Sequence, residues 1–193
     1  MSETMIQSIC FEKPGPKNTA RTLEIAKRRA NELDVRTVLV ATTRGTTGVQ
    51  AAQMFKNYDG DLVVVSHSTG FRESNVQELT DENKTAIEAA GARVLTCQHA
   101  FGGVSRAVRK KLDTYLTDEI IAYTLRIFGQ GMKVCVEMAL MAADAGLVEV
   151  GEACVAVAGT GRGADTAVVL VPANAQQFFD LRVLEVLAKP RLA

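Results

Sequence analysis

The feature that most constrains this 193-residue chain is a strand-forming run that breaks into a polar, glycine-bearing loop and then into a helix. The clearest case is residues 38–48, VLVATTRGTTG, where an apolar, β-branched run is typical of a buried strand and a helical pattern begins near Thr46. The pattern recurs, which favours a parallel sheet with helices on both faces. We expect strands at 36–42, 62–66, 93–97 and 153–158, and helices at 19–33, 46–57, 76–90 and within 104–147.

Two further segments complete the expected architecture. Residues 167–171 follow the strand at 153–158 after too few residues for a crossover helix, so we expect them to run antiparallel to it. The tail between Pro172 and Pro190 fits a helix or a strand, and we favour a final strand. The helix at 130–145 is apolar around most of its circumference, so we expect it to be covered on several sides, by its own domain or by another subunit.

Length and composition favour one domain spanning residues 1–193. The 22 basic and 22 acidic residues balance, so no net field attracts nucleic acid or an anionic membrane, and the basic run at 106–111 is typical of a solvated helix face. No apolar run reaches the ~18–20 residues of a membrane span, and residues 1–10 lack the features of a signal peptide, so we expect a cytoplasmic protein. Four cysteines without a CxxC pair and only two histidines favour reduced thiols and no metal site.

Polar, glycine-bearing loops follow each of the four expected parallel strands. They read TTRGTTG, HSTGF, QHAFGG and GTGRGADT, whereas the opposite ends of the strands receive ordinary turns such as YDGD. The carboxyl ends of parallel strands meet at one edge of the sheet, where α/β proteins bind their ligands. We therefore expect a binding site at this edge.

The residues of two loops indicate a phosphate as the group that is bound. Arg44 and Arg162 each stand among glycines and threonines, and guanidinium and backbone N–H groups both donate to phosphate oxygens. We expect these two arginines to converge on one phosphate or on two neighbouring ones. The alternative for the first loop is that Thr46 only caps the helix and Gly45 only supplies an unusual backbone angle.

The known catalytic and nucleotide-binding motifs do not fit. No GxxxxGK[ST] is present, and GTGRGA at 159–164 leads into a strand rather than a helix, unlike the dinucleotide-binding turn. His67 and Ser68 are adjacent, but there is no GxSxG elbow. We expect His67 and His99 to be binding or structural groups rather than general bases.

Residues 20–48 and 136–163 resemble two units of a known domain, the C-terminal α/β domain of pyruvate kinase in its stand-alone form. The first is ARTLEIAKRRANELDVRTVLVATTRGTTG and the second is VEMALMAADAGLVEVGEACVAVAGTGRG, and the similarity covers roughly residues 18–171. The resemblance implies a three-layer α/β/α sandwich around a mixed five-stranded sheet with one antiparallel edge strand. The catalytic barrel of pyruvate kinase has no counterpart here, so pyruvate kinase activity is not expected.

The resemblance also implies a ligand. In pyruvate kinase this domain holds the phosphates of a regulatory sugar phosphate, which maps onto Thr42, Gly45, Thr46, Thr47 and residues 159–163, although Arg44 and Thr160 depart from the family pattern. Stand-alone relatives are linked to flavin mononucleotide (FMN), whose ring would need apolar cover such as Phe71, Phe101, Phe128 and Met132. The expected ligand-binding residues are Thr42, Thr43, Arg44, Gly45, Thr46, Thr47, Gly48, His67, Ser68, Thr69, Phe101, Gly102, Gly131, Met132, Lys133, Gly159, Thr160, Gly161, Arg162, Gly163 and Thr166.

Two functions are thus expected from the sequence. The first is binding of a phosphate-bearing small molecule, with FMN as the leading ligand and a sugar phosphate as an alternative. The second is a regulatory or assembly module without a permanent ligand, for which the apolar helix at 130–145 predicts a homo-oligomer. No nucleic-acid or membrane partner is expected.

Overall fold

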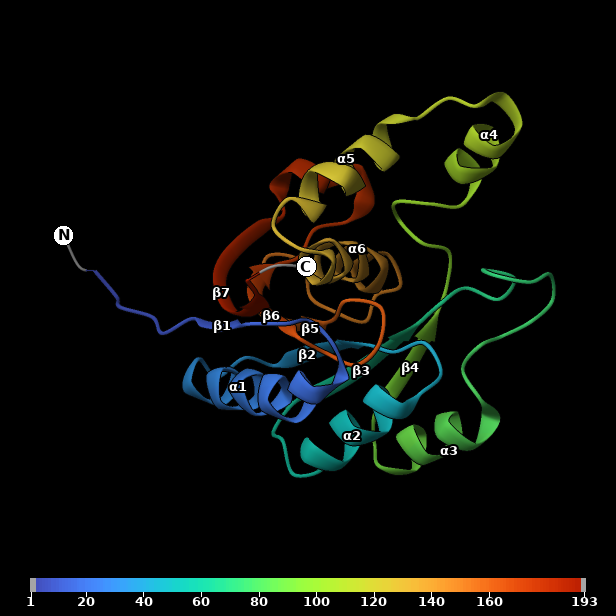
Figure 1. The fold of residues 1–193 in the computed structure, drawn as a ribbon. Helices are drawn as coiled ribbons and strands as arrows, with labels where there is room; N and C mark the ends of the chain where they lie inside the picture. Colours follow the sequence, from blue (N-terminus) through green and yellow to red (C-terminus); the bar gives the residue numbers. More distant parts are fainter. Residues whose placement is uncertain (1–2, 192–193) are drawn as a thin grey trace.

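The computed structural model describes residues 3–191, and its seven strands form one mixed sheet in the order β1-β7-β6-β5-β2-β3-β4 (Figure 1). Every strand runs in the same direction except β6, which is antiparallel to both of its neighbours, β5 and β7. The strands are β1 (Ile9–Phe11), β2 (Thr37–Ala41), β3 (Asp61–Ser66), β4 (Arg93–Thr96), β5 (Cys154–Ala158), β6 (Thr166–Val171) and β7 (Arg182–Pro190). The helices are α1 (Thr19–Glu32), α2 (Thr46–Met54), α3 (Asp81–Ala89), α4 (Val104–Leu112), α5 (Thr117–Arg126) and α6 (Gln130–Asp144), with short 3-10 turns at Pro16–Asn18 and Ala175–Asp180.

Helices cover both faces of the sheet, as the strand–helix alternation predicts. Figure 1 shows α1, α2 and α3 on one face and α4, α5 and α6 on the other. The alternating side chains of β2 explain this arrangement, because Val38 and Val40 pack in the core under α1–α3, whereas Leu39 packs in the core under α6. A strand that is buried on both faces needs the continuous apolar run seen in the sequence.

The sheet has seven strands, so the expected five-stranded sheet with an antiparallel edge strand is wrong. The antiparallel direction of β6 relative to β5 is confirmed, but β6 lies inside the sheet because β7 and then β1 extend it beyond that strand. The final strand expected in the tail is β7. Strand β1 has only three residues, which is too short for a period-2 pattern to identify it in the sequence.

Helix α6 is buried on all sides within its own chain. Twelve of its fifteen residues are buried, from Gly131 to Ala143. It packs on β2, β3, β5 and β6 on one side and against α5 and the 3-10 turn at Ala175–Asp180 elsewhere. Its own domain therefore covers the apolar surface of α6. This helix gives no reason to expect another subunit.

Helix α3 begins five residues later than expected, at Asp81 rather than Val76. The Thr80 hydroxyl accepts a hydrogen bond from the backbone N–H of Asn83 at 3.3 Å, and Asp81 and Glu82 stand in the first turn, where acidic side chains favour the helix dipole. These capping interactions, rather than the apolar periodicity of the preceding residues, determine where the helix begins. The segment 67–79 is consequently an irregular loop that follows β3 at the carboxyl edge of the sheet.

The remaining expectations concern membranes and cysteines. None of the helices in residues 3–191 is long and apolar enough to span a membrane. All four cysteines are free thiols; Cys135 and Cys154 are buried and Cys10 is exposed. Within the same residues, no group of three or more His, Cys, Asp or Glu side chains is arranged to hold a metal ion.

Candidate functional site

A cleft of about 760 Å³ opens at the carboxyl edge of the parallel strands. The loops after β2, β3 and β5 and the residue His99 after β4 all contribute to it, as do the segment before α1 and one face of α6. Its volume lies within the ~300–1,000 Å³ of small-molecule sites. The residues that line it are Pro16, Thr19, Ala41, Thr42, Thr43, Arg44, Thr46, Thr47, Gln50, Val65, Ser66, His67, Phe71, Arg72, Glu78, His99, Gln130, Val134, Glu137, Met138, Met141, Gly159, Gly161, Arg162 and Gly163.

The β2–α2 loop brings a helix N-terminus to the cleft. Gly45 is the N-cap and has a left-handed φ of 107°, and a Cβ there would lie 2.3 Å from Cβ of Asn83. The Thr42 hydroxyl accepts hydrogen bonds from the N–H groups of Gly45 at 3.2 Å and Gly48 at 3.3 Å. Thr46 is therefore the first residue of α2 rather than its cap. Its N–H belongs to the group that an α-helix leaves without an intrahelical partner.

The β5–β6 loop is built around a buried carboxylate. Asp165 is fully buried and accepts hydrogen bonds from the N–H groups of Gly15 at 3.0 Å and Thr160 at 3.1 Å and from the Thr166 hydroxyl at 2.9 Å. The loop approaches the start of α1 so closely that a Cβ on Gly163 would lie 2.4 Å from Cα of Pro16. Asp165 thus ties the glycine-rich loop to the N-terminal segment.

Arg44 and Arg162 are both exposed and both line this cleft. The two loops that carry them follow β2 and β5, which are neighbours in the sheet. In the β5–β6 loop the Thr160 hydroxyl is buried and makes no hydrogen bond to any described residue. The cleft therefore combines two guanidinium groups, the threonine hydroxyls of the first loop and the positive end of a helix dipole.

The opposite wall of the cleft carries a histidine paired with a glutamate. His67 Nδ1 lies 2.8 Å from Glu78 Oε2, and Glu78 Oε1 also pairs with Arg72 Nε at 3.1 Å. The Phe71 ring lies over His67, with the ring centroids 4.3 Å apart. Burial lowers the pKa of His67, with smaller contributions from the nearby Arg72 and His99, and outweighs the raising effect of Glu78.

A second histidine–glutamate pair lies behind the first. His99 Nδ1 is 3.4 Å from Glu137 Oε2, and the buried Lys133 ammonium donates to the same oxygen. Glu137 Oε1 accepts from the backbone N–H of Phe101 at 3.0 Å. Burial raises the pKa of Glu137, but His99 and Lys133 together outweigh burial and hold it at about 2. Burial lowers the pKa of Lys133, and its ion pair with Glu137 does not fully offset that effect.

The expected binding residues divide between this cleft and the core. Thr42, Thr43, Arg44, Thr46, Thr47, His67, Gly159, Gly161, Arg162 and Gly163 line the cleft. Gly45 and Thr160 in its loops and Gly48 in the first turn of α2 do not line it. Ser68 and Thr69 lie in the loop after β3 outside the lining, and Phe101, Gly102, Gly131, Met132, Lys133 and Thr166 are buried behind it.

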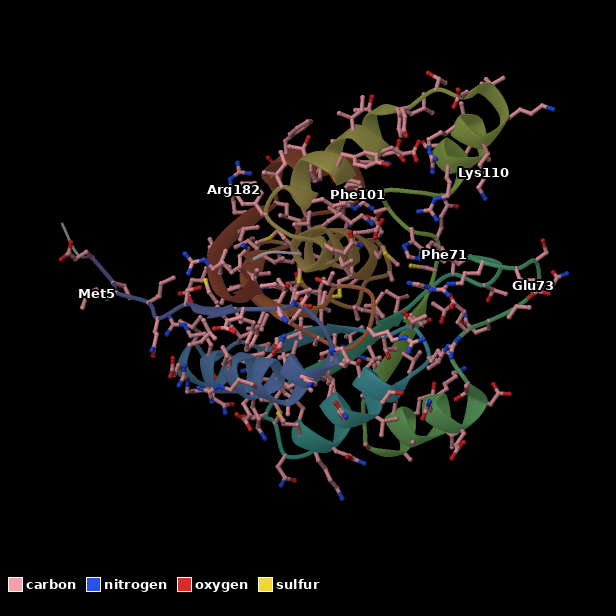
Figure 2. All side chains as sticks on the ribbon, viewed as in Figure 1. Met5, Phe71, Glu73, Phe101, Lys110 and Arg182 are labelled. Carbon is pink, nitrogen blue, oxygen red and sulfur yellow. The ribbon has the colours of Figure 1, made fainter. Side chains whose placement is uncertain are left out.

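The aromatic and apolar residues that line the cleft differ from those expected to cover a flavin ring. Phe71 lines the cleft, whereas Phe101 is buried in the core under α6 (Figure 2). Phe101 packs edge-on against Phe178, and Phe128 is exposed and does not line the cleft. Met132 is buried in the same core as Phe101. Besides Phe71, the larger apolar side chains that line the cleft are Val65, Val134, Met138 and Met141.

Three acidic side chains that organise the site had no motif to identify them. Glu78 falls within the helix expected at 76–90, but in the structure it lies in the loop after β3. The i, i+4 pair of Lys133 and Glu137 on an otherwise apolar helix was the one visible signal for a buried ionic group. Asp165 follows three glycines in seven residues, and nothing in the sequence separates it from a solvated loop aspartate.

Comparison with known proteins agrees with the fold. The family model for the pyruvate kinase alpha/beta domain matches residues 20–170. Among solved structures, a pyruvate kinase from Cryptosporidium parvum is similar with a TM-score of 0.41 and 10% identity over 79% of this chain and 22% of that chain. An O-ureido-L-serine synthase is similar with a TM-score of 0.32 and 15% identity over 50% of this chain and 30% of that chain. Both TM-scores are below 0.5, so the assignment rests on the family model. On that match over most of its length, the chain belongs to the pyruvate kinase alpha/beta domain family.

Proposed function

We propose that this protein binds a phosphate-bearing small molecule in the cleft, with its phosphate between the β2–α2 and β5–β6 loops. The observation that carries the proposal is the convergence of Arg44 and Arg162, which are far apart in the sequence, on one cleft beside the N-terminus of α2. The proposal is one of binding and does not include the phosphoryl transfer of pyruvate kinase.

FMN is the first ligand to test. Its phosphate suits the two arginine loops, and its flat apolar ring needs the kind of wall that Val65, Phe71, Met138 and Met141 provide. An absorbance spectrum of freshly purified protein, with mass spectrometry of whatever denaturation releases, is the most direct test. Yellow protein that releases FMN supports the flavin, and a different phosphorylated compound in the released fraction replaces FMN while keeping the phosphate site.

We expect Arg44→Ala and Arg162→Ala each to weaken FMN binding by about 10- to 100-fold, because a charge-assisted hydrogen bond contributes about 1.5–3 kcal/mol. Riboflavin lacks only the phosphate, so its affinity should stay nearly unchanged in both variants. Quenching of flavin fluorescence measures both dissociation constants.

The matched control is Arg21→Ala, which removes an exposed arginine of α1 that pairs with Glu24 and should change neither affinity. Equal losses for FMN and riboflavin would mean that the arginines support the loops instead of the phosphate. Binding of neither flavin would reject FMN and leave other phosphorylated ligands.

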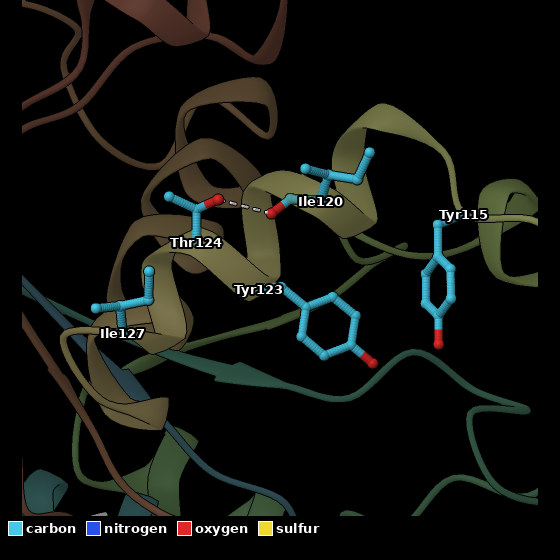
Figure 3. Close-up of a pocket in the computed structure, with 5 residues that line it drawn as sticks. All are labelled: Tyr115, Ile120, Tyr123, Thr124 and Ile127. Atoms are coloured by element: carbon cyan, nitrogen blue, oxygen red, sulfur yellow. Dashed lines mark hydrogen bonds between the residues drawn. The ribbon is translucent and has the colours of Figure 1, made fainter.

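A second candidate function, assembly through self-association, is favoured by α5 rather than by α6. Ile120, Tyr123 and Thr124 of α5 and Ile127 directly after its end are spaced i, i+3, i+4 and i+7. With Tyr115 they line a hollow of about 520 Å³ (Figure 3). Their exposure is high, at 56% for Ile120, 54% for Tyr123 and 81% for Ile127. We propose a second copy of the chain as the occupant, because a two-fold axis would bury this exposed stripe against its own equivalent and needs no second complementary surface.

Ile127→Asp is therefore expected to convert a dimer into a monomer, because it places an unpaired charge in the apolar stripe that the dimer would bury. Sedimentation velocity at micromolar concentration measures the change. Val150→Asp, at an exposed valine far from α5 in the sequence, is the control and should leave the dimer intact. A wild-type protein that sediments as a monomer at these concentrations contradicts the assembly function.

A further inference from the structure

The inner wall of the cleft holds two imidazoles, each with Nδ1 against a carboxylate and with Nε2 free of that partner. The pairs are His67 with Glu78 and His99 with Glu137, and the two rings are 5.3 Å apart. We propose that this wall is a proton-transfer site in which His67 is the general base for a phosphorylated carbonyl compound. The inference rests on the phosphate-binding part of the proposed function and does not require a flavin.

The pairing with Glu78 fixes which nitrogen of His67 accepts a proton. Glu78 also receives the Arg72 guanidinium, as an ionised carboxylate does, so His67 Nδ1–H donates to Glu78 and the lone pair lies on Nε2. This is the arrangement that orients a histidine base and stabilises the imidazolium after it takes a proton. Glu78 is thus a positioning residue and not a catalytic one.

His67 rather than His99 is placed to meet a ligand. Both residues line the cleft, but the side chain of His67 is 25% exposed and that of His99 is 12% exposed. Nε2 of His99 is buried and has no hydrogen-bond partner among the described residues, so His99 is a second polar group behind the first. The Phe71 ring lies against both imidazoles, 4.3 Å from His67 and 4.7 Å from His99 between centroids.

The groups around His67 keep it neutral, as a base must be at neutral pH. Arg72 and Glu78 come from its own loop, and His99 faces it from the segment after β4. Behind His99 stand Glu137 and Lys133 of α6, and the Arg106 guanidinium of α4 lies over the Phe71 ring at 4.8 Å. Burial, Arg72 and His99 lower the pKa of His67 and only Glu78 raises it, so the ring is mostly uncharged at pH 7.

The proton-transfer step balances without a further reactant. A C–H bond next to the substrate carbonyl breaks, its proton moves to Nε2 of His67, and the electron pair passes to the carbonyl oxygen as an enolate. The Arg72 guanidinium, which lines the cleft and uses Nε for Glu78, retains N–H groups that can donate to the enolate oxygen. If the imidazolium exchanges its Nε2 proton with solvent, return of a solvent-derived proton to the same carbon gives hydrogen exchange. In a substrate with a hydroxyl on that carbon, the hydroxyl proton can pass to the enolate oxygen, and return of the imidazolium proton to the former carbonyl carbon then gives an isomer.

Sheet order sets the distance between the phosphate and the reacting carbon. The arginine loops follow β5 and β2, and His67 follows β3, which is next to β2 in the order β5-β2-β3. Neighbouring strands are about 4.8 Å apart, so the base stands roughly 5–10 Å from the phosphate. That separation suits a sugar phosphate of about three to six carbons.

The test is exchange of carbon-bound hydrogen for deuterium in D₂O, followed by ¹H NMR. The probes are dihydroxyacetone phosphate, ribulose 5-phosphate and fructose 6-phosphate, and the dissociation constant of each is measured on the same protein by calorimetry. We expect at least one bound probe to lose the signal of the hydrogen next to its carbonyl faster than in buffer. His67→Gln should slow this loss by about 10²- to 10⁴-fold and change the dissociation constant less than about 3-fold.

Controls separate this inference from the proposed function. Glu78→Gln should slow exchange and lower the pKa of His67 further, while Glu88→Gln, the same change at an exposed glutamate of α3, should do neither. Arg44→Ala should weaken binding. Probes that bind without accelerated exchange, or exchange that persists in His67→Gln, overturn the base while leaving the phosphate site; binding of no probe and no flavin overturns both.

A measurement on the wild-type protein without substrate tests the inference even if the variants fold poorly. In ¹⁵N-detected NMR of the wild-type protein, with His99→Gln to assign the two rings, His67 should carry its proton on Nδ1 and titrate below the ordinary histidine pKa. A proton on Nε2 of neutral His67 would overturn the inference.

Discussion

Lys133→Met is expected to lower the free energy of unfolding by about 3–5 kcal/mol, because it leaves the buried carboxylate of Glu137 without its ammonium partner. Lys133 and Glu137 are 6% and 4% exposed at their side chains, so water cannot replace the lost charge. His99 and the N–H of Phe101 remain as donors, but neither carries a permanent positive charge. Urea unfolding of the wild type and the variant at pH 7 measures the difference.

The matched control is Lys84→Met, which removes the lysine of another i, i+4 pair, with Glu88, whose side chains are both about half exposed. An exposed pair of this kind contributes about 0.3–0.5 kcal/mol. The double variant Lys133→Met with Glu137→Leu should recover much of the loss, because it removes both buried charges together. A loss in Lys133→Met no larger than that in Lys84→Met would contradict the importance of the buried pair.

Asp165→Ala is expected to lower the free energy of unfolding by about 2–4 kcal/mol, since it leaves buried hydrogen-bond donors without an acceptor. Gly15 N–H, Thr160 N–H and the Thr166 hydroxyl all donate to this carboxylate. The same variant should weaken the binding of a phosphate-bearing ligand, because the β5–β6 loop loses the carboxylate that holds it in place. Thermal unfolding and the FMN titration measure the two effects.

Asp144→Ala provides the comparison for Asp165→Ala. Asp144 also accepts two hydrogen bonds, from the side chain of Asn174 and the N–H of Ala175, but at an exposed position. Water replaces the lost acceptor there, so the expected loss is about 1 kcal/mol or less. Similar losses in the two variants would show that the carboxylate of Asp165 is no more important than a surface aspartate.

The central part of the fold could be predicted from the sequence because its signals are local and repeated. The continuous apolar runs of β2, β3 and β5 and the short β5–β6 connection were sufficient to predict parallel strands and one antiparallel strand. Strand β1 and the place of β7 in the sheet were not predicted, and both strands lie outside the residues 20–170 that match the family domain. Their pairing joins residues near the two ends of the chain, and no local pattern encodes that contact.

The candidate site was predictable only where strand ends define it. Residues that follow a parallel strand reach the same edge, so Arg44 and Arg162 could be placed near one another from topology alone. Glu78, Glu137 and Asp165 reach the site through a loop, a helix face and a buried turn, and their roles depend on tertiary contacts. The two histidines were expected to be binding or structural groups, because the sequence does not show that a carboxylate stands behind each ring.

The hydrogen bond from Gly15 to Asp165 couples the far edge of the sheet to the cleft. Gly15 follows β1, a three-residue edge strand whose only ladder partner is β7, and short edges of this kind open locally more often than a core does. A ligand that requires an ordered β5–β6 loop also favours the docked N-terminal segment, and by reciprocity docking of that segment raises the affinity for the ligand. Amide hydrogen exchange at residues 9–15 is therefore expected to slow when a ligand occupies the cleft, although β1 does not line it.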